Sequence, residues 1–233
     1  MSAKLSALGA SAPVLTPSLL ARLYELNFDY LELALVEHRD ARADGPHHLP
    51  RNVAQSLAEC PIEARRALAR TTFSLYALGF EDQHFWRKAL HAGERPIEAR
   101  YRRESPQTFR TSFCELALLH AWHVAVTQPV AARMVYGMPQ DVVQRMERAR
   151  LWQLKRIASD YPELLMPRWP TNPCFWPDMV RFARLGDQRR LSMTQQLGHQ
   201  LIAAELLACE MPNSPVRQRQ SNLLVQRLAA RRR

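Results

Sequence analysis

Two histidines and one cysteine are the side chains whose placement could support metal or nucleophilic chemistry. His120 and His123 are three residues apart in a segment of helical periodicity, so they share one helix face and could bind a metal together. No third ligand is near, because Cys114 would point roughly 120° away from His120 on the same helix. Cys60 precedes Pro61 at an expected helix start, where a thiolate is favoured, but no histidine or acid is spaced to use it. We therefore expect no metal, no cofactor and no enzymatic activity.

The clearest binding motif is a helix-turn-helix pattern around Gly137. Glycine can adopt the positive φ of such a turn, and five apolar residues stand where two such helices bury each other: Ala132, Tyr136, Met138, Val143 and Met146. The outward residues of the second helix would be Gln140, Asp141, Gln144 and Arg145, of which Gln and Arg can pair with adenine and guanine edges. Arg133 replaces the usual small residue, and Asp141 would repel phosphates. An ordinary helix hairpin ended by glycine has the same pattern.

Basic residues supply the expected phosphate contacts. The net charge is +10, of which the segment 216–233 carries +6 without any acid. In addition to Arg145, we assign DNA contacts to Arg148 and Lys155 after the turn, and to the tail residues Arg217, Arg219, Arg231, Arg232 and Arg233. A solvated helix face and a solubilising tail are the alternative interpretations.

The elements that would position these residues are helices. Proline and N-cap residues precede runs of apolar residues at helical spacing, and no stretch alternates as a strand would. The pattern predicts one helix of about six turns from Pro139 to Asp160. We expect an all-α protein with two tandem helical units at 1–95 and 96–211, and a basic tail at 212–233. The absence of a signal peptide or long apolar run favours a cytoplasmic protein.

An internal repeat is visible at an offset of 89 residues. The segment Leu49–Leu57 resembles Met138–Met146, and Leu68-Ala69 falls on Ile157-Ala158. Phe85-Trp86 falls on Phe175-Trp176 with one more residue of offset. The two tandem units are therefore interpreted as diverged copies. The alternative is a chance similarity among helices whose N-termini carry similar residues.

The first copy resembles the FlhD subunit of the bacterial flagellar master transcription activator. The matching residues are Leu20–Leu31, Val53–Leu57, Leu68–Thr71, and the pair Phe80 and Asp82, which together span about 75 residues. The chain departs from the family in two ways: Tyr76 stands where that family has its subunit-bridging cysteine, and the chain is about twice as long.

The resemblance implies an all-helical transcription-factor subunit that binds promoter DNA with an FlhC-like partner and recruits RNA polymerase. We expect such a protein to form homo- or hetero-oligomers and not to bind a membrane. We assign its partner interface to the opening helix, through Leu23, Tyr24, Phe28, Tyr30 and Leu31. The alternative function is a helical adaptor or assembly protein of a bacterial secretion or transfer apparatus that does not touch DNA.

Overall fold

Prolines and glycines set several helix ends. Helix α1 (Pro17–Arg39) begins after Thr16, whose hydroxyl accepts a hydrogen bond from the Leu19 amide. Helix α7 (Pro129–Tyr136) begins with a proline and ends at Gly137, which has a φ of 63°. The computed structural model describes residues 15–39, 47–91 and 108–211.

The described residues are predominantly helical, which confirms the all-α class. Beside α1 and α7, they form α2 (Arg51–Ala58), α3 (Ile62–Ala69), α4 (Gln83–Leu90), α6 (Phe109–Thr127), α8 (Gln140–Glu147), α9 (Leu151–Asp160), the short 3-10 helix η1 (Pro162–Leu164), α10 (Phe175–Leu185) and α11 (Gln188–Glu210). Two short strands, β1 (Tyr76–Ala77) and β2 (Met166–Pro167), pair antiparallel.

One segment that was expected to form a single helix forms two helices. The segment predicted as a single helix from Pro139 to Asp160 breaks between α8 and α9, and the backbone of Arg150 is extended there. The side chain of Gln153 accepts a hydrogen bond from the Arg150 amide at 2.8 Å and so begins a new helix. Neither glycine nor proline marks this break, which is why the periodicity did not reveal it.

The elements recur in the two halves of the chain. Residues 51–58 of α2 fall on α8 at an offset of 89, and α3 falls on the first eight residues of α9. The amide of Phe85 donates to Asp82 and that of Phe175 donates to Asn172, two matching hydrogen bonds at an offset of 90. The indoles of Trp86 and Trp176 donate to the carbonyls of Gly79 and Arg168, respectively. The repeat therefore extends to side-chain hydrogen bonds.

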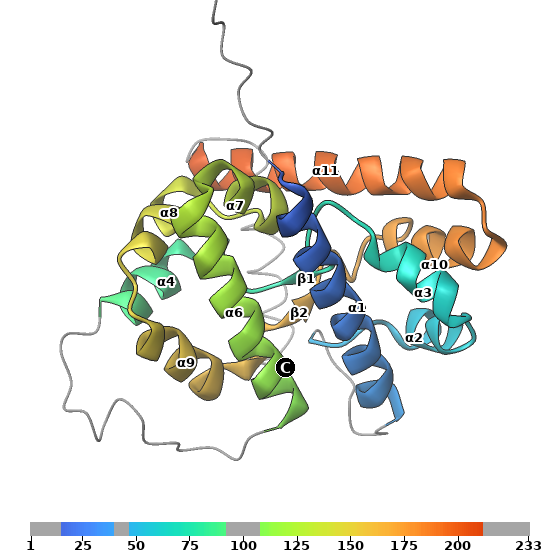
Figure 1. Cartoon of the computed structure of the whole chain (residues 1–233), viewed down its shortest axis with the longest axis horizontal. Coiled ribbons are helices and arrows are strands. Elements are labelled where there is room, and N and C mark those ends of the chain that lie inside the picture. The colour runs from blue at the N-terminus through green and yellow to red at the C-terminus, as the bar shows by residue number, and fades with distance from the viewer. Residues whose placement is uncertain (1–14, 40–46, 92–107, 212–233) are drawn as a thin grey trace, which may run out of the picture.

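The two copies exchange the equivalent helices α4 and α10. Helix α4 of the first half packs against α8 and α9, while its counterpart α10 packs against α2 and α3 (Figure 1). Helices α1 and α6 lie together in the middle, and the β1–β2 pair joins the copies behind them. The two units expected at 1–95 and 96–211 consequently share one continuous core.

Helix α11 lies across both copies (Figure 1) and has a close contact at its centre. A Cβ on Gly198 would lie 2.7 Å from Cε1 of the buried Phe73 ring, and closer still to Cζ. We expect Gly198→Ala to lower the free energy of unfolding by about 1–2 kcal/mol, because the clash exceeds the roughly 1 kcal/mol that alanine adds to a helix. Urea unfolding measures this change, and a stabilised variant would contradict the close contact.

Candidate nucleic-acid interface

The predicted helix-turn-helix residues form a packed hairpin of α7 and α8. Gly137 is in the left-handed conformation. The five apolar residues assigned to its interior are all buried: Ala132, Tyr136, Met138, Val143 and Met146. The turn and the packing of the hairpin are therefore as predicted, a geometry that an ordinary helix hairpin shares.

The N-terminus of α8 is occupied by a carboxylate from α11. Glu210 accepts a hydrogen bond from the Gln140 amide at 3.1 Å and from both terminal nitrogens of Arg133, at 2.6 and 3.0 Å. Arg133 also donates to the Gln140 side chain at 3.2 Å, and this arginine lowers the pKa of Glu210. Glu210 thus fills the position at a helix N-terminus that favours an anion, and the predicted base reader Gln140 is already engaged.

Most of the predicted phosphate contacts on α8 and α9 are paired with acids. Arg145 forms a two-point contact with Asp141, both of its distances being 3.0 Å. Lys155 lies 3.4 Å from Glu115 of α6. Gln144 and Arg148 are exposed. The structure therefore brings the predicted residues to neighbouring helices but neutralises much of their charge. Arg217, Arg219, Arg231, Arg232 and Arg233 lie outside the described residues.

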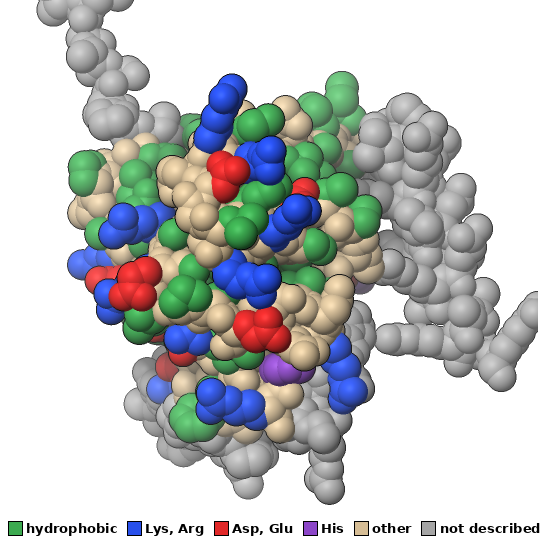
Figure 2. All heavy atoms as spheres, turned by 90° about the vertical axis from the view of Figure 1, so that its right-hand side faces the viewer, with side chains coloured by type: hydrophobic (Ala, Val, Ile, Leu, Met, Phe, Trp, Pro, Cys, Tyr) green, Lys and Arg blue, Asp and Glu red, His purple; other side chains and the backbone are tan. Residues whose placement is uncertain are grey.

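A second basic surface is formed by α2, α3, α10 and the start of α11. We name it the arginine face. It carries eight arginines and four carboxylates: Arg51, Arg65, Arg66, Arg70, Arg181, Arg184, Arg189 and Arg190, with Glu59, Glu63, Asp178 and Asp187. Figure 2 shows this side of the molecule, where basic side chains are spread among apolar and acidic ones. No local sequence pattern indicates this face, because its helices come from separate parts of the chain.

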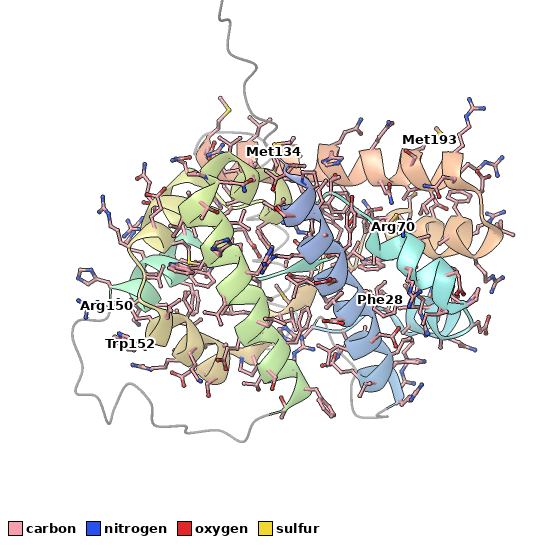
Figure 3. The ribbon with its side chains drawn as sticks, in the orientation of Figure 1. Phe28, Arg70, Met134, Arg150, Trp152 and Met193 are labelled. Atoms are coloured by element: carbon pink, nitrogen blue, oxygen red, sulfur yellow. The ribbon has the colours of Figure 1, made fainter. Side chains whose placement is uncertain are left out.

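The predicted partner interface on α1 is largely core. Leu23, Tyr30 and Leu31 are buried, so the assignment of these three residues to an exposed interface is wrong. The hydrophobic periodicity of α1 did not separate core residues from partner-facing residues, because α2, α3 and α6 cover this helix on several sides. Tyr24 and Phe28 are half-buried, and Phe28 lies on the side of α1 that faces α3 (Figure 3), with the Arg66 guanidinium 6.0 Å from its ring centroid.

His120 is bound to a tyrosine rather than paired with His123. Its Nδ1 is in hydrogen-bond contact with the hydroxyl of Tyr136. Burial, with a smaller contribution from the positive charge of His123, lowers the pKa of His120 to about 4. Among the described residues, no three His, Cys, Asp or Glu side chains group as metal ligands would.

The lowered pKa of His120 has a consequence for stability. An unfolded histidine titrates near 6.5, so the unfolded chain binds an extra proton between about pH 6.5 and 4 and stability falls as the pH falls through that range. We expect His120→Gln to flatten this loss in urea titrations at several pH values. Burial raises the carboxyl pKa of Asp29 and Glu81, which acts in the opposite sense, so the difference between variant and wild type isolates His120. Parallel pH profiles would contradict the prediction.

Comparisons with known proteins returned no match to this chain, whether against family models, curated proteins or solved structures. Within 15–39, 47–91 and 108–211, no helix combines the length and apolar character needed to cross a bilayer.

Proposed function

We propose that the chain is a DNA-associated transcription-regulator subunit that acts in a cytoplasmic hetero-oligomer with an FlhC-like partner. The observation that carries the proposal is the extent of the repeated unit. The segments that resemble the flagellar activator subunit lie on α1, on α2, at the end of α3 and just before α4, so the resemblance reaches three of the four helices of the first copy and stops at the start of the fourth. A single chain with two copies then serves as a built-in dimer.

The adaptor function remains the second candidate, and two observations favour it. Ion pairs neutralise much of the charge on α8 and α9. Large apolar side chains are also exposed on α6, on α7 and at the end of α11, and α7 packs against both of these helices: Val126, Val130, Met134, Leu207 and Met211. Such a surface suits a protein partner better than a phosphate backbone.

A pulldown of the tagged full chain from its native host separates the two functions. One half of the sample is treated with nuclease, bound DNA is sequenced, and bound proteins are identified by mass spectrometry. The regulator proposal expects a defined promoter to be enriched in the untreated half, with an FlhC-like protein or RNA polymerase. Recovery of nuclease-insensitive apparatus components without enriched DNA would overturn it in favour of the adaptor.

A further inference from the structure

The arginine face differs from the α8–α9 surface in how its charges are paired. On α8 and α9, Arg145, Lys155 and Arg156 each contact a carboxylate. On the arginine face, Arg65, Arg184 and Arg190 do so. Four exposed arginines of this face form no ion pair with any described carboxylate: Arg66, Arg70, Arg181 and Arg189. Unpaired arginines are the ones whose charge is available to an incoming anion.

Three of the four unpaired arginines line a pocket or lie over an aromatic ring: Arg66, Arg70 and Arg181. Arg66 lies on α3, and Arg70 is the residue that follows the end of this helix. Together with Glu63, Ala67 and Gln188, they line a surface pocket of about 420 Å³, in which two guanidinium groups face one carboxylate. The rings of Phe28 and Phe182 lie beneath Arg66 and Arg181, with guanidinium carbons 6.0 and 5.9 Å from the ring centroids. Ring contacts leave the guanidinium donors free to point outward.

We propose that the arginine face, and not α8, holds the phosphate backbone of double-stranded DNA. This proposal rests on the proposed function. A guanidinium presents a fork of donors that matches phosphate oxygens in two-point contacts. Several such forks on packed helices contact successive phosphates without reading bases. The surface therefore supplies affinity and orientation, while sequence selection falls to the partner subunit of the assembly.

The test compares two variants of the full chain, each of which loses four positive charges. The arginine-face variant carries Arg66→Gln, Arg70→Gln, Arg181→Gln and Arg189→Gln. The control variant carries Arg145→Gln, Arg148→Gln, Lys155→Gln and Arg156→Gln. Fluorescence anisotropy with a labelled DNA duplex gives the dissociation constant at several salt concentrations, and thermal melting checks that each variant is folded.

The expected result is a loss confined to one variant. Each phosphate contact contributes about 0.9 to the slope of log affinity against log salt, so the arginine-face variant should lose about 2–4 from that slope and at least about ten-fold in affinity at low salt. The control should keep the wild-type slope. Equal losses in both variants, or a loss in the control alone, would overturn the arginine face but leave DNA association standing. A wild-type chain that binds no duplex, alone or with its partner, would overturn the proposed function and this surface with it.

Discussion

Replacing Asn27 by alanine should lower the free energy of unfolding by about 3–5 kcal/mol. Asn27 is fully buried on α1, and its amide nitrogen lies 3.2, 2.9 and 2.9 Å from the Ala69 carbonyl, the Thr71 hydroxyl and the Phe73 carbonyl. Its side-chain oxygen accepts from the Leu75 amide at 2.9 Å. Alanine would leave the Ala69 carbonyl and the Leu75 amide without their Asn27 partner and open a small cavity, while the Phe73 carbonyl would keep only the Thr71 hydroxyl. The four contacts hold the irregular segment after α3 against α1.

The second copy offers a matched control for Asn27. Cys114 stands 87 positions after Asn27 and occupies the equivalent place on α6. It is also fully buried, but its side chain forms no hydrogen bond with a described residue. Cys114→Ala removes only a small apolar volume, so we expect it to cost about 1 kcal/mol. Urea unfolding of the two variants gives the difference. Equal losses would show that the polar contacts of Asn27 contribute little beyond packing.

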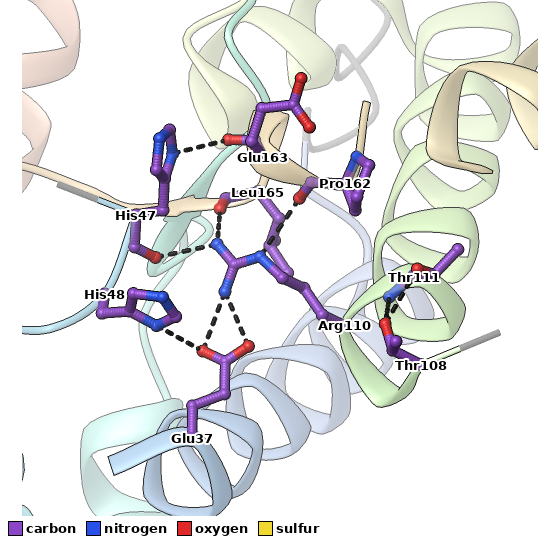
Figure 4. Close-up of polar contacts among 9 residues, drawn as sticks. All are labelled: Glu37, His47, His48, Thr108, Arg110, Thr111, Pro162, Glu163 and Leu165. Carbon is purple, nitrogen blue, oxygen red and sulfur yellow. Dashed lines mark hydrogen bonds and ion pairs between the residues drawn. The ribbon is translucent and has the colours of Figure 1, made fainter. Parts of the chain in front are cut away.

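Replacing Arg110 by methionine should cost about 2–4 kcal/mol, well above the usual value of a surface ion pair. Arg110 of α6 donates to both carboxylate oxygens of Glu37 on α1, at 2.7 and 2.8 Å. Its remaining donors contact the carbonyls of His47, Pro162 and Leu165 (Figure 4). Only 16% of the Arg110 side chain and 18% of that of Glu37 are exposed. One guanidinium thus joins the two copies. Methionine would leave the carbonyls of His47 and Leu165 without this donor, and it would leave the Glu37 carboxylate with only its contact to His48.

An exposed pair provides the control for this clamp. Arg184 contacts Glu59 at 3.1 Å, with 51% and 57% of the two side chains exposed. Solvent screens such a pair, so Arg184→Met should change stability by less than about 1 kcal/mol. A double-mutant cycle between Arg110→Met and Glu37→Gln should return a coupling of about 1–3 kcal/mol. A coupling near zero would show that the carbonyl contacts alone account for the loss.

Local signals in the sequence predicted most helices, but they could not predict which helices pack together. Proline, glycine and capping residues act within one helical turn, so the ends of α1, α7 and α10 could be predicted from the residues beside them. The pairs Phe85-Trp86 and Phe175-Trp176 are visible in the sequence as a repeated feature, yet their hydrophobicity does not indicate which copy they pack into. The exchange of α4 and α10 therefore lay outside sequence reasoning.

The candidate site shows the same division between local and distant contacts. The packing of α7 on α8 depends on residues close in sequence around Gly137 and was predicted. The engagement of Gln140 by Glu210 depends on a residue 70 positions away. The charge of Arg145 is cancelled from within its own helix by Asp141, whose spacing of four residues was visible beforehand. Arg66 and Arg189 meet on one face only after the chain has folded.

The exchange of α4 and α10 between the copies also determines the order in which the chain can fold during synthesis. Helix α4 leaves the ribosome before α8 and α9, the helices against which it packs. The apolar side of α4, including Trp86, stays uncovered until the second copy has emerged. The surfaces of α2 and α3 that pack against α10 stay uncovered for the same reason. A nascent chain of this kind gains its core late, so a ribosome that stalls between the copies would release an aggregation-prone fragment rather than a half-sized working protein.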